Sequence, residues 1–257
     1  MKTNSAVKTA AVLALLAPVC GCSLNAKLVP LSRDVPCAAE AEKNLGLRGG
    51  AATSFTGTLD MRVSSKPVNI KKRVRAAFEA PDKLRLEVRG AWNEPLLMLT
   101  AKGGEIKAHF TKENRGVTAL LDDIKKRKGF ILGAADFVDI LRGNMDPEKF
   151  RHSELSGTED CSAIRALYDA GQGMKYEYVI LDGNRLAEEK ILFNGRKPVI
   201  IGYKYGEAAG SGLPEEIRIE DEELDFRLTV NFREGNTGGG NLPAETFELN
   251  FPPNTCS

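Results

Sequence analysis

The sequence predicts a mainly β (α+β) protein in which a strongly curved antiparallel sheet of about 11 short strands folds over helices as an incomplete barrel. Three observations lead to this class. Apolar and polar residues alternate with period two through two long stretches, and one intervening stretch has helical spacing. Turn-forming residues separate the segments, and neither an internal repeat nor a linker divides the chain.

The first group of strands is clearest between Asp82 and Thr100. Leu84, Leu86 and Val88 alternate with charged residues, and Gly90 to Pro95 then breaks the pattern before Leu96 to Leu99 resumes it. Such alternation is typical of a strand with one apolar face. The strands expected in this group cover residues 55–63, 70–78, 84–88, 94–101 and 105–111.

Helical spacing appears at three places. A short helix is expected over residues 37–45, ended by Gly46. Val117, Leu120, Leu121 and Ile124 have the spacing of one helix face. Residues 130–141 are apolar on most sides, with Asp136 and Asp139 on one edge, so this helix must be covered.

The second group of strands follows Pro147. Leu224, Phe226 and Leu228 begin its longest uninterrupted alternation, and Glu220 to Glu223 is expected to be a solvent-facing hairpin turn. The expected strands cover residues 150–155, 163–168, 175–181, 186–193, 198–205, 216–219, 224–232 and 246–251.

Composition excludes several classes of function. The 257 residues carry a formal net charge of +1, which favours no nucleic-acid partner. Only 2 histidines occur, His109 and His152, and both are interpreted as satisfied or exposed strand residues. Motifs for a nucleophile elbow, a zinc site or a phosphate loop are absent. The sequence therefore predicts no enzyme, no cofactor and no metal site.

Two basic runs have two interpretations each. Residues 71–73 and 125–128 are consecutive lysines and arginines that could contact anionic headgroups or an acidic partner. Basic residues in turns and at helix ends are more often simply solvated, and we favour that interpretation for both runs.

The N-terminus predicts export and lipidation. Lys2 and Lys8 precede a short apolar core at residues 10–17, which is too short to span a bilayer. The following residues resemble a bacterial lipobox, with Cys22 as the lipidated (palmitate-bearing) residue and residues 1–21 as signal peptide. An ordinary cleaved export signal is the alternative. Ser23, by resemblance to enterobacterial sorting signals, favours the outer membrane over the inner membrane.

Residues 22–50 are expected to form a lipidated tether with the short helix, and residues 51–257 a single folded domain, most simply a monomer. Three more cysteines, Cys37, Cys161 and Cys256, lie in the exported chain. The periplasm is oxidising, so one disulfide and one free thiol is the simple expectation. Unpaired buried thiols remain the alternative, and the sequence does not choose a pair.

Trp92, the chain's single tryptophan, lies in the break between the strands at 84–88 and 94–101. Turns of glycine, asparagine and proline are ordinarily polar throughout. The ring therefore either packs back onto the sheet or is exposed for a purpose.

The lipobox, the strand pair around P-D-K-L-R-L-E-V-R-G and the helix ending F-V-D-I-L-R-G resemble the LolA/LolB family of lipoprotein-sorting proteins. The resemblance covers roughly residues 50–250. It implies a curved sheet of 11 strands closed by helices over an apolar cavity. Trp92 would then tip a loop that inserts into the membrane. The residues expected to line the cavity are Leu59, Met61, Leu84, Leu86, Val88, Leu97, Leu99, Phe137, Leu141, Phe226 and Leu228.

In function, the resemblance implies a LolB-like receptor that is anchored in the outer membrane and faces the periplasm. It would act as a chaperone, accepting lipoprotein acyl chains from a soluble periplasmic carrier and inserting the lipoprotein among membrane lipids, with no bond-making step. The alternative is a lipoprotein of the same fold that binds another apolar ligand or acts as an envelope scaffold.

Overall fold

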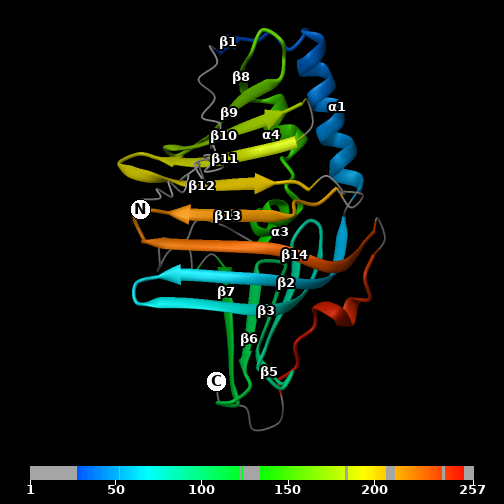
Figure 1. Ribbon diagram of the computed structural model, residues 1–257, viewed down its shortest axis with the longest axis vertical. Coiled ribbons are helices and arrows are strands. Elements are labelled where there is room, and N and C mark those ends of the chain that lie inside the picture. The colour runs from blue at the N-terminus through cyan, green and yellow to red at the C-terminus, as the bar shows by residue number, and fades with distance from the viewer. Residues whose placement is uncertain are drawn as a thin grey trace, which may run out of the picture.

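A computed structural model describes residues 28–51, 53–121, 123, 134–182, 185–206, 212–238 and 241–251 (Figure 1). Its described part is mainly β, with one antiparallel sheet of 14 strands that stays open. The expected class, a curved antiparallel sheet forming an incomplete barrel, is confirmed, while the strand number of about 11 is wrong. The strands are β1 (Val29–Pro30), β2 (Ser54–Ser65), β3 (Val68–Glu79), β4 (Lys83–Arg89), β5 (Pro95–Lys102), β6 (Glu105–Phe110), β7 (Arg115–Leu120), β8 (Glu154–Gly157), β9 (Ala163–Gly171), β10 (Met174–Leu181), β11 (Arg185–Phe193), β12 (Arg196–Lys204), β13 (Glu216–Asp221) and β14 (Phe226–Gly238).

The strand order joins two meanders. Strands β2 to β7 pair in sequence order, as do β8 to β13, and β14 lies between β13 and β2. Strands β1 and β7 are therefore the two edges. In Figure 1, β10 to β14, β2 and β3 run nearly side by side across the view, while β5 to β7 run almost at right angles to them. This change of direction along one sheet is the curvature that the sequence predicted.

Alternation along each strand separates two faces of the sheet. Leu59, Val74 and Val88 are directly opposite one another in β2, β3 and β4, so their side chains share one face. We name this the inner face, because the core residues of the helices pack with it. The opposite, outer face carries charged pairs such as Arg165 with Glu177. The polar-out, apolar-in pattern is the one that the sequence alternation predicts.

Three helices are described: α1 (Pro36–Ala51), α3 (Ala134–Arg142) and α4 (Pro147–Arg151). Ala38, Ala41 and Leu45 of α1 are buried in the common core, so this helix belongs to the folded unit. It runs past Gly46, where we expected it to end. Helix α3 coincides with the expected helix at 130–141 from Ala134 on, continues one residue further to Arg142, and contacts β4.

A disulfide fastens α1 to the sheet. Cys37 at the start of α1 bonds to Cys161, which precedes β9, with Cα atoms 6.1 Å apart. The expectation of one disulfide is confirmed, and the pair is now identified. The third cysteine, Cys256, lies outside the described residues.

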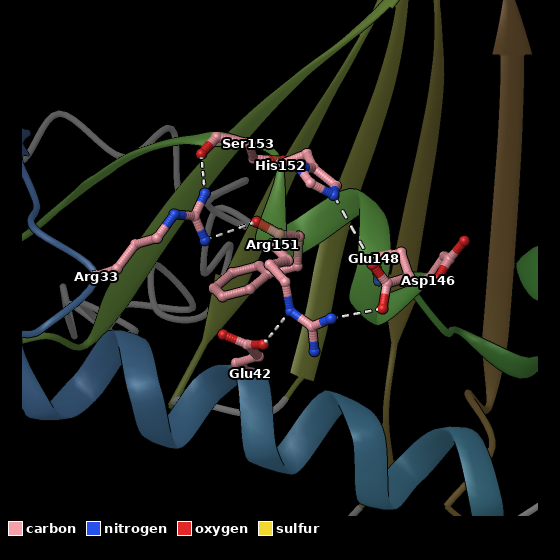
Figure 2. Close-up of polar contacts among 8 residues, drawn as sticks. Arg33, Glu42, Asp146, Glu148, Arg151, His152 and Ser153 are labelled. Carbon is pink, nitrogen blue, oxygen red and sulfur yellow. Dashed lines mark hydrogen bonds and ion pairs between the residues drawn. The ribbon is translucent and has the colours of Figure 1, made fainter.

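Polar contacts also connect the N-terminal segment to α4 (Figure 2). Arg151 of α4 lies between two carboxylates, with its Nε 2.9 Å from Oε1 of Glu42 in α1 and its Nη1 2.6 Å from Oε1 of Glu148. Ahead of α1, Arg33 donates hydrogen bonds to the carbonyl oxygens of Phe150 and Ser153. Helix α4 and the start of β8 are therefore held to the N-terminal segment from two sides.

Three expected elements differ in the structure. Strand β7 takes residues 117–120 of the helix expected around residues 117–124, because the turn after β6, with Asn114 at a positive φ of 45°, brings the chain back onto β6. Leu121 and Asp123 are helical, as expected. Helix α4 takes the first two residues of the strand expected at 150–155, and strand β8 begins only at Glu154. The start of α4 was signalled by Asp146, whose Oδ1 accepts a hydrogen bond from the Glu148 amide, and by Pro147 in the first turn.

The strand expected at 246–251 is a 3₁₀ helix, η1 (Ala244–Phe247), followed by extended chain. Arg85 of β4 donates to the carbonyl oxygens of Thr246 and Glu248. A side chain therefore satisfies backbone groups that a neighbouring strand would otherwise pair with.

Candidate functional site

The strand registers bring the expected lining residues onto one face. Leu86 is opposite Leu99, and Val88 is opposite Leu97, between β4 and β5. Leu59 and Met61 point the same way on β2, and Phe226 and Leu228 of β14 lie opposite Ser65 and Val63 of that strand. Leu84 lies on the same face of β4, two residues before Leu86 and opposite Ala101 of β5. The last two residues, Phe137 and Leu141, come from α3, whose core side chains pack with this inner face.

Burial divides these residues into two groups. Leu59, Leu84, Leu141 and Leu228 are buried in the core. The others are only half-buried and keep part of their apolar surface accessible; they are Met61, Leu86, Val88, Leu97, Leu99, Phe137 and Phe226. By contrast, the inner face across β9 to β13 is closed, with Ile164, Ile180, Ile191, Ile201 and Ile217 fully buried.

A polar cluster interrupts the inner face beneath α3 and α4. Glu189 of β11 is buried there and accepts a hydrogen bond from the Tyr203 hydroxyl, with oxygens 3.2 Å apart. It lies in a small pocket with Asp136 and Asp139 of α3 and Lys149 of α4. The sequence interpretation did not single out Glu189. The sequence did contain a signal for it: Glu189 is two residues before Ile191 in β11, so the alternation of the strand places both side chains on the same face.

Burial changes the acidity of this cluster. Desolvation raises the pKa of Glu189 from 4.5 to about 7, although Lys149 and the Tyr203 hydroxyl oppose the change. Desolvation likewise raises the pKa of Asp139 to about 6, opposed by Arg142, whose Nη1 is 3.2 Å from Oδ1 of Asp139. Near pH 7 Glu189 is therefore about half protonated, whereas Asp139 is mostly protonated only below pH 6.

The β4–β5 turn presents Trp92 to solvent. The side chain is 91% exposed, so it does not pack back onto the sheet. The turn beneath it is ordered by polar contacts. The backbone amide of Trp92 donates to Oε2 of Glu94 at 2.9 Å, and the Gly90 amide donates to the Glu94 carbonyl at 2.8 Å. Asn93 takes a left-handed conformation at φ 64°, which asparagine tolerates well.

The other expected residues contribute no site. His109 is buried, with Nε2 3.4 Å from Oδ1 of Asn114, and His152 is exposed beside Glu148 at the end of α4. Within the described ranges, no group of three or more histidine, cysteine or acidic residues could hold a metal ion. Nor does any helix of that part combine the length and the hydropathy needed to cross a membrane. The expected signal peptide at 1–21, the expected lipidation site Cys22 and the basic run at 125–128 lie outside the described residues.

The class defined by this geometry is a mainly β protein with an open, curved antiparallel sheet and helices on its inner face. Solved structures share it. A LolA superfamily protein from Nitrosomonas europaea matches with a TM-score of 0.51 at 10% identity, covering 83% of this chain and 97% of its own. A DUF1329 family protein from Desulfovibrio piger matches with a TM-score of 0.53 at 10% identity and the same two coverages.

A protein domain from Vibrio parahaemolyticus, named for outer-membrane lipoprotein sorting, matches with a TM-score of 0.51 at 11% identity, covering 80% of this chain and 97% of its own. The chain therefore has the fold found in LolA superfamily proteins. No protein-family model matches the sequence, and no curated protein matches it.

Proposed function

We propose that this chain binds lipid acyl chains on its inner face and acts as a LolB-like receptor. It takes lipoproteins from a soluble periplasmic carrier and delivers them to the outer membrane. The observation that carries the proposal is the group of half-buried apolar side chains on β2, β4, β5 and β14, opposite Phe137 of α3. The fold shared with LolA superfamily and lipoprotein-sorting structures supports the same assignment.

The physics of transfer is differential binding. Each methylene that leaves water is worth about 0.8 kcal/mol, whichever apolar surface receives it. Cargo moves forward only if the inner face holds the acyl chains more tightly than the carrier does and less tightly than the bilayer. A half-covered apolar wall suits this intermediate role, because part of its surface stays available for an incoming chain.

Two attachments would place the protein at one membrane. Lipidation of Cys22 would provide an anchor that is stable when two or more acyl chains insert. Trp92 would enter the interface, where an indole buries its ring and keeps its N–H hydrated. Strands β4 and β5 carry both the Trp92 turn and part of the apolar wall. The turn and the wall would therefore approach the membrane as one piece, in a monomer that faces the periplasm.

The test compares neighbouring residues on opposite faces of β5. The double variant Leu97→Gln/Leu99→Gln places two amides on the inner face, whereas Met98→Gln places one on the outer face between them. Binding of a fluorescent acylated peptide should weaken at least tenfold in the double variant and stay unchanged in Met98→Gln. Equal binding by all three proteins would contradict the proposed acyl-binding face.

A second assay tests the receptor role itself. Purified carrier loaded with an acylated lipoprotein is mixed with liposomes that contain this protein, and lipoprotein in the liposomes is measured. The proposal predicts transfer that depends on Leu97 and Leu99. Binding of free acyl chains without any transfer would favour a lipoprotein that holds another apolar ligand.

A further inference from the structure

A cationic groove lies on the outer face beside the Trp92 turn. It has a volume of about 270 Å³ and is lined by Thr58 of β2, Arg73 and Arg75 of β3, and Arg89, Gly90, Ala91 and Asn93 around the end of β4. Thr58 and Arg75 are directly opposite each other, one position out of phase with the inner-face pair Leu59 and Val74. The groove is therefore separate from the acyl-binding face, on the other side of the same strands.

The three arginines leave positive charge unneutralised. Arg75 is exposed and makes no ion pair with any residue that the structure describes. Arg73 has its Nε 3.3 Å from Oδ1 of Asp60, but Arg233 shares that carboxylate, with its Nε 2.9 Å from Oδ2. One carboxylate thus serves two guanidinium groups, and none of the lining residues is acidic.

Arg89 is the ordered member of the three. Its Nη2 is 2.6 Å from Oε1 of Glu87, and its Nη1 donates to the carbonyl oxygen of Asn93 at 3.1 Å. Its Nε is buried and has no hydrogen-bond partner in the described part of the chain. The side chain is therefore held against the turn, with one donor left unsatisfied. Glu94, the acidic residue of the turn, is not a lining residue, although its carboxylate accepts a hydrogen bond from the Trp92 amide and lies against Gly90.

We propose that this groove binds the phosphate of an anionic phospholipid headgroup when Trp92 enters the membrane interface. Guanidinium groups match phosphate oxygens in geometry as well as charge, which makes arginine the preferred residue for such contacts. Ala91 and Asn93, the neighbours of Trp92 on both sides, line the groove. An indole at the interface therefore places the arginines at headgroup level. The inference rests on the proposed membrane role of Trp92 and names the lipid class that this role requires.

The test uses the full-length chain, in its natural processed form, reconstituted in vesicles. Trp92 is the single tryptophan, so its emission reports the turn directly. Emission and quenching by brominated lipid are recorded in phosphatidylcholine vesicles with rising fractions of phosphatidylglycerol. Wild-type protein should show a blue shift and quenching that increase with phosphatidylglycerol and weaken at high salt.

At the same phosphatidylglycerol fraction, the variant Arg73→Gln/Arg75→Gln should have a roughly 25-fold lower ratio of inserted to uninserted turn, at about fivefold for each arginine. The matched control is Arg218→Gln/Arg227→Gln, which removes two exposed arginines from the same outer face, on β13 and β14. It should behave as wild type. An equal response of both double variants would overturn a specific site, because general charge attraction would then account for the binding.

Two further measurements separate the outcomes. If inorganic phosphate binds at the arginines, as measured by calorimetry, while Trp92 quenching is independent of phosphatidylglycerol, the groove is a free-anion site and the headgroup proposal is wrong. Acyl-peptide binding by Arg73→Gln/Arg75→Gln should stay at the wild-type level. Loss of headgroup dependence with acyl binding intact supports the groove. If Trp92 quenching depends on phosphatidylglycerol through the arginines but the inner face binds no acyl chain, the headgroup site stands and only the proposed function is refuted.

Discussion

Replacing Glu189 with glutamine should make the stability of the fold much less dependent on pH. Glu189 is buried under α3 and α4, where desolvation raises its pKa, the negative charges of Asp136 and Asp139 raise it further, and Lys149 only partly offsets the change. Its pKa is raised from 4.5 to about 7. The substitution to glutamine keeps the size of the side chain and an acceptor for the Tyr203 hydroxyl, but removes the ionisable proton.

The direction of the pH dependence follows from whether the folded or the unfolded state holds the proton of Glu189. Between pH 4.5 and about 7 the folded state keeps the Glu189 proton and the unfolded state does not. The contribution of Glu189 to the free energy of unfolding is therefore fully present below pH 4.5 and is lost as the pH rises through this window. At about 1.4 kcal/mol per pH unit, the loss approaches 3 kcal/mol by pH 8. Asp139, with a pKa raised to about 6, adds a smaller loss in the same direction because it is partly exposed.

Urea unfolding at pH 5 and pH 8 measures the effect. Glu189→Gln should match wild type at pH 5 and exceed its unfolding free energy by about 2–3 kcal/mol at pH 8. Glu188→Gln is the control, since Glu188 faces the outer side and pairs with Lys190 at 2.7 Å. A variant less stable than wild type at pH 8 would show that Glu189 is stabilised as a carboxylate, and the reasoning would fail.

The other predictions concern the disulfide, the core and the turn. Reducing Cys37–Cys161, which closes a loop of 124 residues, should lower the unfolding free energy by about 2–5 kcal/mol in denaturant titrations with and without reductant. Phe78→Ala should cost about 3–5 kcal/mol, because Phe78 is fully buried and stacks on Phe55 at 5.3 Å. Half-buried Leu86→Ala should cost only about 1 kcal/mol. Trp92→Glu should leave the melting temperature unchanged but stall cargo release in the liposome assay. Wild-type transfer by this variant would remove the membrane role of the turn.

The sequence predicted the features that depend on local pattern. The alternation at Leu84, Leu86 and Val88 placed strand β4 and its apolar face correctly, because a strand buried on one side must alternate with period two. The same rule placed Leu97 and Leu99 together, although the run from 96 to 99 is apolar throughout. There, only the pairing of Leu97 with Val88 shows which residues point inward.

The structural features that could not be predicted from the sequence depend on pairing between residues far apart in the chain. The position of β14 beside β2 joins residues more than 160 apart, and the pairing of Cys37 with Cys161 depends on the same three-dimensional arrangement. Strand β7 was misread as helix because Val117 and Leu120 satisfy a helical spacing, while pairing with β6 decides the outcome. The exposure of Trp92 was likewise open, since a turn sequence permits both orientations of the ring.

Site-specific photo-crosslinking shows directly whether the inner face receives acyl chains. A photoreactive residue is placed at Leu99, on the inner face, and in a second protein at Met98, its outward-facing neighbour, in cells that make native lipoproteins. We expect an adduct between position 99 and an acylated lipoprotein, and none at position 98. Equal labelling at both positions, or no lipoprotein at position 99, would contradict it.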